Sequence, residues 1–403
     1  METVKIKKLV PWAAIFFYLA IALEVIIMIT PFTVYFYSAY APILNWLYAF
    51  PSTAWLTAFF LPHITYPRSL VLLILAYLGP TLLVAGLLLF FFCAGQVYYS
   101  KLFRKGVVTK GPYTIIRHPQ YLGLAIAGLG LLLFWPRFFI LVTYITMLFV
   151  YYLLARSEEG RMLRKFGEGY AGYMEKTSMF IPGEPGARLF RLVPGSARNR
   201  GLALLFLYFL VLAGGIGLGY VLRGYAEARV SVIKARDGVV ISLYPSNEER
   251  MKGLMEVALA DPEVTSYLAA LKGRVNKGSY VAYILPSDYM MQHLIADLGE
   301  HEEHHGKGAQ GGIIPVIRHL GEMLALKPMR QLRDGEASRE KRIIFTEAVT
   351  SKGEPVPVER AMAMDVMRLP VFFVDLDSVD KRVSMVMETP RRHSWGTVPV
   401  PSF

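Results

Sequence analysis

The chain has almost no cysteine and few charged residues, and its first half is poor in acids. The one cysteine, Cys93, excludes an intrachain disulfide and any zinc site built on several cysteine thiolates. Charged residues make up 18% of the 403 positions, against 54% hydrophobic ones. This balance is too apolar for an ordinary soluble protein. The composition therefore indicates a membrane protein.

The positive charge is unevenly distributed. Residues 1–224 contain 20 Lys and Arg against 7 Asp and Glu, whereas residues 225–403 contain 23 against 24. A nucleic-acid binder would carry its basic excess on a soluble face. Here the excess flanks hydrophobic runs, which is typical of segments next to anionic headgroups. We therefore expect a lipid bilayer, and no nucleic acid, as the partner of this part.

Four apolar segments are long enough to cross a membrane. They cover residues 9–29, 70–97, 121–155 and 202–222. A cleaved signal peptide is the alternative for the first, although no small-residue cleavage site follows it. The third is interrupted at Pro136, which predicts a helical hairpin with two arms. The expected fold is an α-helical integral membrane protein with about five embedded helices.

Residues 30–69 are apolar but do not read as one span. They contain five prolines and many Tyr and Trp residues, and no charge before Arg68. Prolines interrupt a continuous helix, and Tyr and Trp favour the membrane interface. We expect a loop with a short interfacial helix here; a further span over residues 43–61 is the alternative.

Residues 225–403 read as a separate α+β extramembrane domain of unknown role, which gives two domains, 1–224 and 225–403. Asp237-Gly238 is predicted to form a hairpin turn, and Asn247 to cap a helix. The predicted strands cover residues 229–233, 239–244, 280–285, 342–347 and 371–375, and further helices start at Pro262 and Ser287.

The basic stretches orient the chain. They cover residues 5–8, 101–117 and 156–200. Placing all three in the cytoplasm is consistent with every predicted span. The last span then carries the chain outward, so we expect residues 225–403 on the extracytoplasmic side. The predicted location is a multi-pass protein in the plasma membrane of a prokaryote or an equivalent membrane.

Polar side chains gather at both ends of the predicted hairpin. Tyr113, Arg117, His118 and Tyr121 surround its start, and Arg156, Glu158 and Glu159 follow about forty residues later. Because the hairpin returns to the membrane surface where it began, the two groups are expected to meet. Tyr170 and Tyr173 follow on one side of a further short helix. Ionisable groups at a bilayer boundary are costly unless they have a function.

This arrangement resembles the isoprenylcysteine carboxyl methyltransferase family and its phospholipid methyltransferase relatives over residues 90–182. The pattern is Gly111-Pro112-Tyr113, Arg117-His118-Pro119-Gln120-Tyr121, Arg156-Ser157-Glu158-Glu159 and Phe166-Gly167 with Tyr170. The resemblance implies that S-adenosylmethionine binds at the cytosolic face through Tyr113, His118, Tyr121, Glu158 and Glu159. From their positions we add Arg117 and Tyr170 as candidates, for which a positive-inside anchor and an aromatic belt are the alternatives. The resemblance also implies a role for Arg156, with Glu159, in catalysis through orientation of the acceptor.

The resemblance leaves the acceptor open. The first prediction is carboxyl O-methylation of a prenylated, isoprenylcysteine-like or other isoprenoid substrate. Gly160-Arg161 stands where isoprenylcysteine enzymes often continue the acidic run, so N-, O- or S-methylation of a phospholipid or another lipid is the alternative. Two further alternatives are an NADPH-dependent reductase of the sterol reductase type and a non-enzymatic membrane sensor with an external domain. An unknown partner of residues 225–403 is also possible.

A histidine cluster occupies residues 301–305, which read His-Glu-Glu-His-His. His301 and His305 have the spacing of zinc ligands in a protease helix, with Glu302 as the base. Glu303 and His304 are charged or polar where a buried active-site helix would need apolar residues. A solvated polar run is the main interpretation, so no metal is predicted, and His301 and His305 are weak candidates.

Overall fold

The computed structural model describes residues 2–39, 41–63, 65–103, 105–183, 197–235, 237–274, 279–289 and 327–389. The histidine cluster and most of the helix predicted from Ser287 lie outside these residues. The chain forms two compact units. Unit 1 comprises residues 1–38, 81–131 and 142–214, and unit 2 comprises residues 39–80, 132–141 and 215–403.

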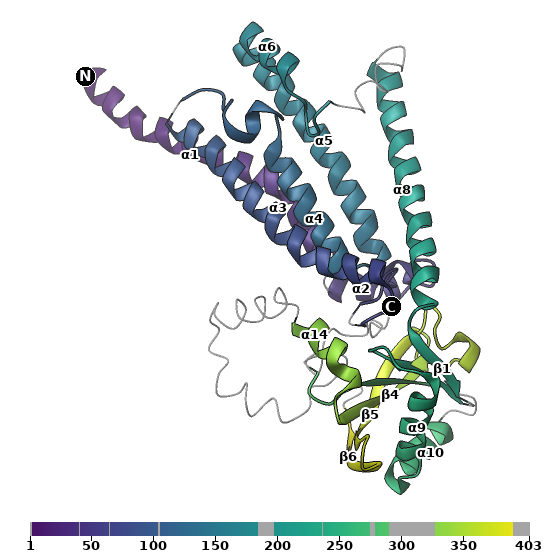
Figure 1. Ribbon diagram of the computed structural model, residues 1–403. Coiled ribbons are helices and arrows are strands. Elements are labelled where there is room, and N and C mark those ends of the chain that lie inside the picture. The colour runs from purple at the N-terminus through teal and green to yellow at the C-terminus, as the bar shows by residue number, and fades with distance from the viewer. Residues whose placement is uncertain are drawn as a thin grey trace. The chain divides into compact units, whose positions relative to one another are not determined.

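Four helices in the described part of the chain are long and apolar enough to cross a membrane. They are α1 (Glu2–Tyr37), α3 (Leu70–Leu102), α5 (Phe138–Phe166) and α8 (Ala197–Glu227) (Figure 1). A shorter apolar helix, α4 (Pro119–Phe134), precedes α5. The prediction of a helical membrane part is thus confirmed. The count of five embedded helices depends on α4 and stays a prediction.

Helix α1 continues past Pro31, where the first predicted span stops short. A proline inside a helix removes one backbone hydrogen bond. The hydroxyl groups of Thr30 and Thr33 donate to the carbonyls of Ile26 and Ile29, 2.6 and 3.0 Å away. Side-chain bonds of this kind are one reason why membrane helices tolerate proline.

Glycines let α3, α4 and α5 approach closely. A Cβ added to Gly86 would lie 2.3 Å from the backbone nitrogen of Ala127, and one added to Gly123 would lie 2.7 Å from that of Phe90. A Cβ on Gly128 would lie 2.9 Å from the Met147 side chain on α5. Small residues at such contacts are common in membrane helices. Gly128 therefore serves helix packing.

The segment after α1 forms short helices, as predicted. These are α2 (Ala41–Tyr48) and the 3-10 helix η1 (Ala54–Thr57). Main-chain bonds attach the segment to the turn between α4 and α5: Phe60 N–H donates to the Pro136 carbonyl at 2.8 Å, and Phe138 N–H donates to the Ala58 carbonyl at 3.1 Å. These residues belong to unit 2 together with the C-terminal sheet.

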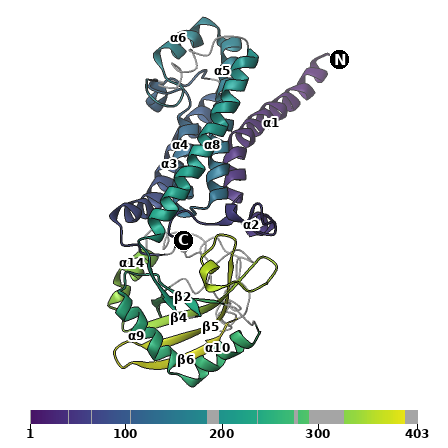
Figure 2. The same ribbon diagram turned by 90° about the vertical axis from the view of Figure 1, so that its right-hand side faces the viewer.

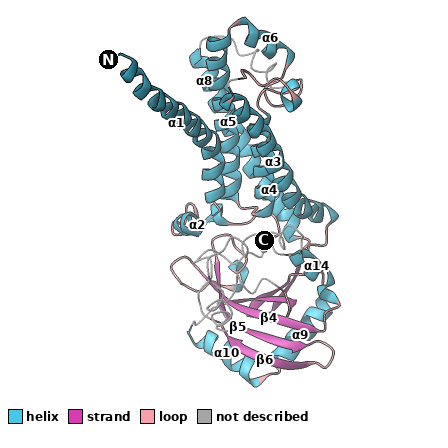
Figure 3. Ribbon diagram, turned by 90° about the vertical axis from the view of Figure 1, so that its left-hand side faces the viewer, coloured by secondary structure: helices cyan, strands magenta, loops and turns pink. Residues whose placement is uncertain are grey.

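The C-terminal part is a six-stranded sheet of order β1-β2-β3-β4-β5-β6, with β2 and β3 parallel and every other pair antiparallel. The strands are β1 (Ser231–Ala235), β2 (Gly238–Ser242), β3 (Tyr280–Pro286), β4 (Glu340–Val349), β5 (Met367–Asp377) and β6 (Arg382–Glu388) (Figure 3). Its helices are α9 (Glu248–Leu259), α10 (Pro262–Arg274) and α14 (Lys327–Arg333), with 3-10 turns at Asp334–Glu336 and Val358–Arg360. The α+β class is confirmed.

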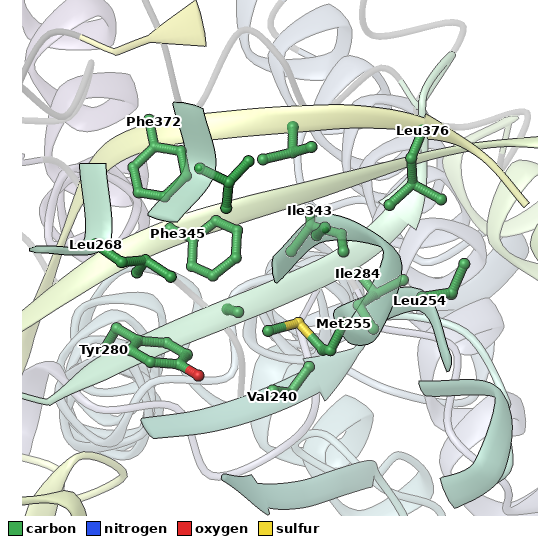
Figure 4. Close-up of a cluster of buried hydrophobic side chains, with 14 of the residues drawn as sticks. Val240, Leu254, Met255, Leu268, Tyr280, Ile284, Ile343, Phe345, Phe372 and Leu376 are labelled. Carbon is green, nitrogen blue, oxygen red and sulfur yellow. The ribbon is translucent and has the colours of Figure 1, made fainter. Parts of the chain in front are cut away.

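Two hydrophobic clusters cover the two faces of the sheet, because successive strand residues point to opposite faces. One face holds Val240, Ile284 and Phe345 and packs against Leu254 of α9 and Leu268 of α10 (Figures 2 and 4). The other packs against Leu332 of α14 and the segment near Met362. The central strands are consequently buried on both sides, which explains their almost continuous apolar sequences.

Candidate active site

The candidate site lies in unit 1, where four pieces of chain meet. They are the 3-10 helix η2 (Gly111–Thr114), the first turn of α4, the last turns of α5, and α6 (Glu168–Lys176). Gly111 has φ +65°, a left-handed conformation that favours glycine. Arg117 N–H donates to the Ser178 carbonyl at 2.8 Å, and His118 N–H donates to that of Met179 at 3.1 Å. The segments before α4 and after α6 are thereby fastened together.

Arg117 is the central cation of the site. Its side chain is buried, and its Nε donates to Oε1 of the buried Glu159 at 2.6 Å. Its Nη1 donates to the carbonyls of Met174, at 3.0 Å, and Thr177. An arginine that anchors the chain to lipid headgroups would have an exposed side chain. The buried Arg117 side chain instead fastens α5 and α6 to the start of α4.

His118 lies between two carboxylates. Its ring is 4% exposed. Nδ1 is 3.5 Å from Glu158 Oε2, and Nε2 is 3.5 Å from Glu159 Oε1. Neither nitrogen has a hydrogen-bond partner in the described structure. Buried polar atoms are usually paired, so each exception calls for an explanation. Two ring nitrogens without a hydrogen-bond partner, each 3.5 Å from a carboxylate, make His118 and its neighbours a candidate ligand site.

Tyr121 links α4 to α5. Its hydroxyl donates to Glu158 Oε1 at 2.6 Å, and its ring stacks on Tyr151 of α5 at a centroid distance of 4.8 Å. The His118 ring stacks on Tyr121 at 5.6 Å and meets Phe180 at 5.8 Å. We define the polar cluster as Arg117, His118, Tyr121, Glu158 and Glu159. The structure thus brings both halves of the predicted pattern together.

Three further tyrosines surround the polar cluster. The Tyr113 hydroxyl lies 3.1 Å from the Cys93 carbonyl and 3.0 Å from Gln120 Oε1, so its proton is shared between two acceptors. The Tyr173 hydroxyl donates to the Tyr113 carbonyl at 2.7 Å. Burial raises the pKa of Tyr113 and Tyr170, and raises the pKa of Tyr173 to about 12. These phenols are neutral donors at physiological pH.

Arg156 does not join the polar cluster. It lies on α5 less than one turn before Glu159, but its side chain is exposed and makes no ion pair or hydrogen bond with the described residues. Its predicted role in orienting an acceptor stays a prediction. In the described part of the chain no group of three His, Cys, Asp or Glu residues is placed to hold a metal. The weak candidates His301 and His305 lie outside it.

Sequence reasoning missed four residues of the site: Gln96, Gln120, Tyr151 and Phe180. Oε1 of Gln96 on α3 is buried without a partner, and a Cβ on Gly111 would lie 3.4 Å from its amide nitrogen. Gln96 is the one amide side chain in the apolar run 70–97, which is the signal that could have identified it. Tyr151 could not be distinguished from the other aromatics of its span.

The sequence model of the phospholipid methyltransferase family matches residues 69–169, about a quarter of the chain. Over this stretch the chain is similar to phospholipid methyltransferases. No curated protein and no solved structure gave a significant match. The family match covers α3, α4, α5 and the whole polar cluster, and it confirms the resemblance inferred from sequence. The match supports a membrane methyltransferase domain over residues 69–169.

Proposed function

We propose that this protein transfers a methyl group from S-adenosylmethionine to a lipidic acceptor, and that the polar cluster is the cofactor site. The observation that carries the proposal is His118, whose two ring nitrogens lie 3.5 Å from Glu158 and Glu159 and lack hydrogen-bond partners. Bound S-adenosylmethionine supplies a methyl carbon on a positively charged sulfur, with a charged amino-acid end.

The residues present fit such a group. Glu158, with 31% of its side chain exposed, can accept from an ammonium, whereas Glu159 is largely occupied by Arg117. The stacked rings of Tyr121 and Tyr151 offer aromatic faces, which attract cations. His118 can pair with a carboxylate or a ring nitrogen of the ligand. The ammonium and the sulfonium of the cofactor, and its carboxylate or a ring nitrogen, thus each have a complementary group in or beside the cluster.

The protein's own contribution is binding, orientation and exclusion of water. Arg117 holds the end of α5 against the start of α4, which fixes the carboxylates. The Tyr121 hydroxyl holds Glu158 in place by a hydrogen bond. The Tyr173 hydroxyl bonds to the Tyr113 carbonyl and so ties α6 to η2. A carboxylate or thiolate acceptor is already ionised and needs no general base from the protein.

The acceptor is proposed to be lipidic because the site adjoins helices with apolar, exposed surfaces. A prenylated carboxylate, with Arg156 as its exposed cationic partner, is the first candidate. A phospholipid-type or isoprenoid amine, oxygen or thiol is the second, and the matched family favours it. The site is proposed to face the cytoplasm, and residues 225–403 the opposite side. Proteolysis of the C-terminal domain in intact cells would support this orientation, and protection would contradict it.

Cofactor binding tests the proposal directly. Purified full-length protein in detergent is titrated with S-adenosylmethionine and, separately, with NADPH. We expect S-adenosylmethionine alone to bind, and His118→Ala to weaken that binding by at least 100-fold. Glu175→Ala, at an exposed position of α6, is the control and should bind normally. Unchanged affinity in His118→Ala would refute the assigned site, and binding of NADPH alone would favour a reductase.

The acceptor can be identified without assuming its chemistry. Membranes with and without the protein are given S-adenosylmethionine carrying a labelled methyl group, and their lipids are analysed by mass spectrometry. Fragmentation of a labelled lipid shows whether oxygen, nitrogen or sulfur carries the label. A protein that binds the cofactor but labels no lipid would contradict the lipidic acceptor.

A further inference from the structure

Unit 2 contains a pocket that the methyltransferase site does not involve. Its cavity volume is about 610 Å³. It is lined by the residues before α3, the residues that follow α8, strand β1 and the start of α9. Both helices that lead to it are long and apolar enough to cross a membrane.

Two arginines line this pocket, and main-chain bonds hold them side by side. Arg68 N–H donates to the Arg229 carbonyl at 3.3 Å, which joins the entry of α3 to the exit of α8. The Arg229 guanidinium stacks 3.5 Å above the Tyr225 ring, and its Nη1 donates to the Tyr225 carbonyl at 3.0 Å. Neither arginine forms an ion pair with a carboxylate in the described structure. The pocket lining therefore contains two arginines without a carboxylate partner among the described residues.

The lining also contains two serine hydroxyl groups, of Ser231 and Ser246. Ser246 is 3% exposed, and its hydroxyl oxygen has no partner in the described structure. Ser231 Oγ accepts from Ser246 N–H at 3.1 Å, which leaves the Ser231 proton available for a ligand. An unpaired buried hydroxyl is unusual, and a ligand in the pocket would satisfy it.

The start of α9 strengthens the preference for an anion. A helix N-terminus carries partial positive charge and favours negative groups. Asn247 caps this helix of 12 residues by accepting from Arg250 N–H at 2.9 Å. The one acid of the lining, Glu248, lies 2.6 Å from Lys252 Nζ, which compensates its charge.

The position of the arginines indicates where such an anion would come from. Arg68 precedes α3 by two residues, and Leu70 at the start of that helix is 73% exposed. Val221, two turns before Arg229, is 68% exposed. Apolar side chains this exposed, on helices able to cross a membrane, place both arginines near the level of lipid headgroups.

From these observations we propose that this pocket binds a phosphate group, held by Arg68, Arg229, Ser231 and Ser246. The phosphate of a membrane lipid is the source that the position favours, and free phosphate is the other source of the same chemistry. Such a site would seat the sheet of unit 2 on the bilayer surface. The proposal is independent of the methyltransferase function, because none of these residues belongs to the polar cluster.

Calorimetry with the full-length protein in detergent tests the proposal, with short-chain phosphatidylglycerol and inorganic phosphate as separate probes. We expect saturable binding of the lipid, weakened at least tenfold by Arg68→Gln with Arg229→Gln and several-fold by Ser246→Ala. Arg382→Gln removes the same charge from an exposed position of β6 and should bind normally.

The two probes distinguish the sources of phosphate. Inorganic phosphate that displaces the lipid at equal concentration would support a soluble ligand, and displacement only at large excess would support the lipid. Ser246→Ala removes no contact in the structure, so it provides a folded variant if the arginine variants fail to fold. Absence of saturable lipid binding would overturn the proposal. So would a variant that carries both Ser246→Ala and Arg68→Gln and binds the lipid as tightly as the wild type.

Discussion

Each unit of this protein contains a buried arginine that is paired with a carboxylate, and the two pairs differ in what surrounds them. In unit 2, Arg342 and Asp375 lie opposite each other on β4 and β5 and form two bonds of 2.6 Å. The guanidinium also lies 4.1 Å from the centre of the Phe373 ring. Both carboxylate oxygens accept from the same arginine, so this pair is complete in itself.

In unit 1, Glu159 has more than one neighbour. Its Oε1 accepts from Arg117 at 2.6 Å and also faces His118 at 3.5 Å, while Glu158 stands on the other side of that ring. The comparison teaches that burial of an ion pair alone does not mark a functional site. What distinguishes the candidate site is that two ring nitrogens of His118 lie beside the ion pair without a hydrogen-bond partner.

The largest effects are expected when one arginine of a pair is removed. Arg342→Met and Arg117→Met should each destabilise their own unit by about 3–5 kcal/mol, because each leaves a buried carboxylate without its cation. Adding Asp375→Leu to the first, or Glu159→Leu to the second, should restore most of the stability. Native-state hydrogen exchange of the full chain in detergent measures both.

Activity then separates the two pairs. The Arg342→Met variant with Asp375→Leu should transfer methyl groups normally, whereas Arg117→Met with Glu159→Leu should be inactive although folded. Methyl transfer from labelled S-adenosylmethionine is the assay. Activity in the folded Arg117→Met, Glu159→Leu variant would show that the unit 1 pair is merely structural, like the pair in unit 2.

A third buried cation sharpens the comparison, because among the described residues no carboxylate pairs with it. Lys341 on β4 is 0% exposed, and its Nζ donates to the Gly335 carbonyl and lies 4.9 Å from the centre of the Tyr244 ring. Burial lowers the pKa of Lys341 from 10.5 to about 8. Between these values the unfolded chain holds a proton that the folded chain has released, so stability should rise with pH.

The rise should amount to about 3 kcal/mol between pH 8 and pH 10.5 and should be absent below pH 8. Lys341→Met should remove this dependence. Hydrogen-exchange protection of β3 to β5 is compared between wild type and variant at each pH, so that the intrinsic exchange rate cancels. Parallel curves for the two proteins across this range would contradict the lowered pKa.

The smallest effects concern single hydroxyl groups. Tyr121→Phe removes a bond to an ionised carboxylate, worth about 1.5–3 kcal/mol, and should weaken S-adenosylmethionine binding by about 10- to 100-fold. Tyr48→Phe removes a bond to the Asp365 carbonyl in unit 2, worth about 1 kcal/mol, and should leave cofactor binding unchanged. If both substitutions changed the affinity for S-adenosylmethionine equally, the proposal that the cofactor binds in unit 1 beside Tyr121 would be contradicted.

Much of the fold was predictable from local patterns. Hydrophobic length located the long helices, Pro136 located the hairpin turn, and Asn247 is the observed cap of α9. The strand β6 was not predicted. As an edge strand it is half exposed, and its sequence, with charges at Arg382 and Glu388, lacks the alternation that a buried face imposes.

The candidate site was predictable in its members but not in its arrangement. The motif placed His118, Glu158 and Glu159 on the same side of a hairpin, and the structure brings them together. Two features could not be derived: the carbonyl ligands of Arg117 after α6, which depend on the path of the backbone, and the burial of Gln96 Oε1, which depends on the packing of α3.

The pairing of the residues before α4 with those after α6 has a consequence for biosynthesis. The carbonyls that receive the backbone N–H groups of Arg117 and His118 belong to Ser178 and Met179. Until residues 178 and 179 have been translated, the backbone N–H groups of Arg117 and His118 lack these acceptors. Once Met179 has left the ribosome these two bonds can form, before the sheet has been synthesised. The candidate site can thus assemble ahead of the C-terminal sheet.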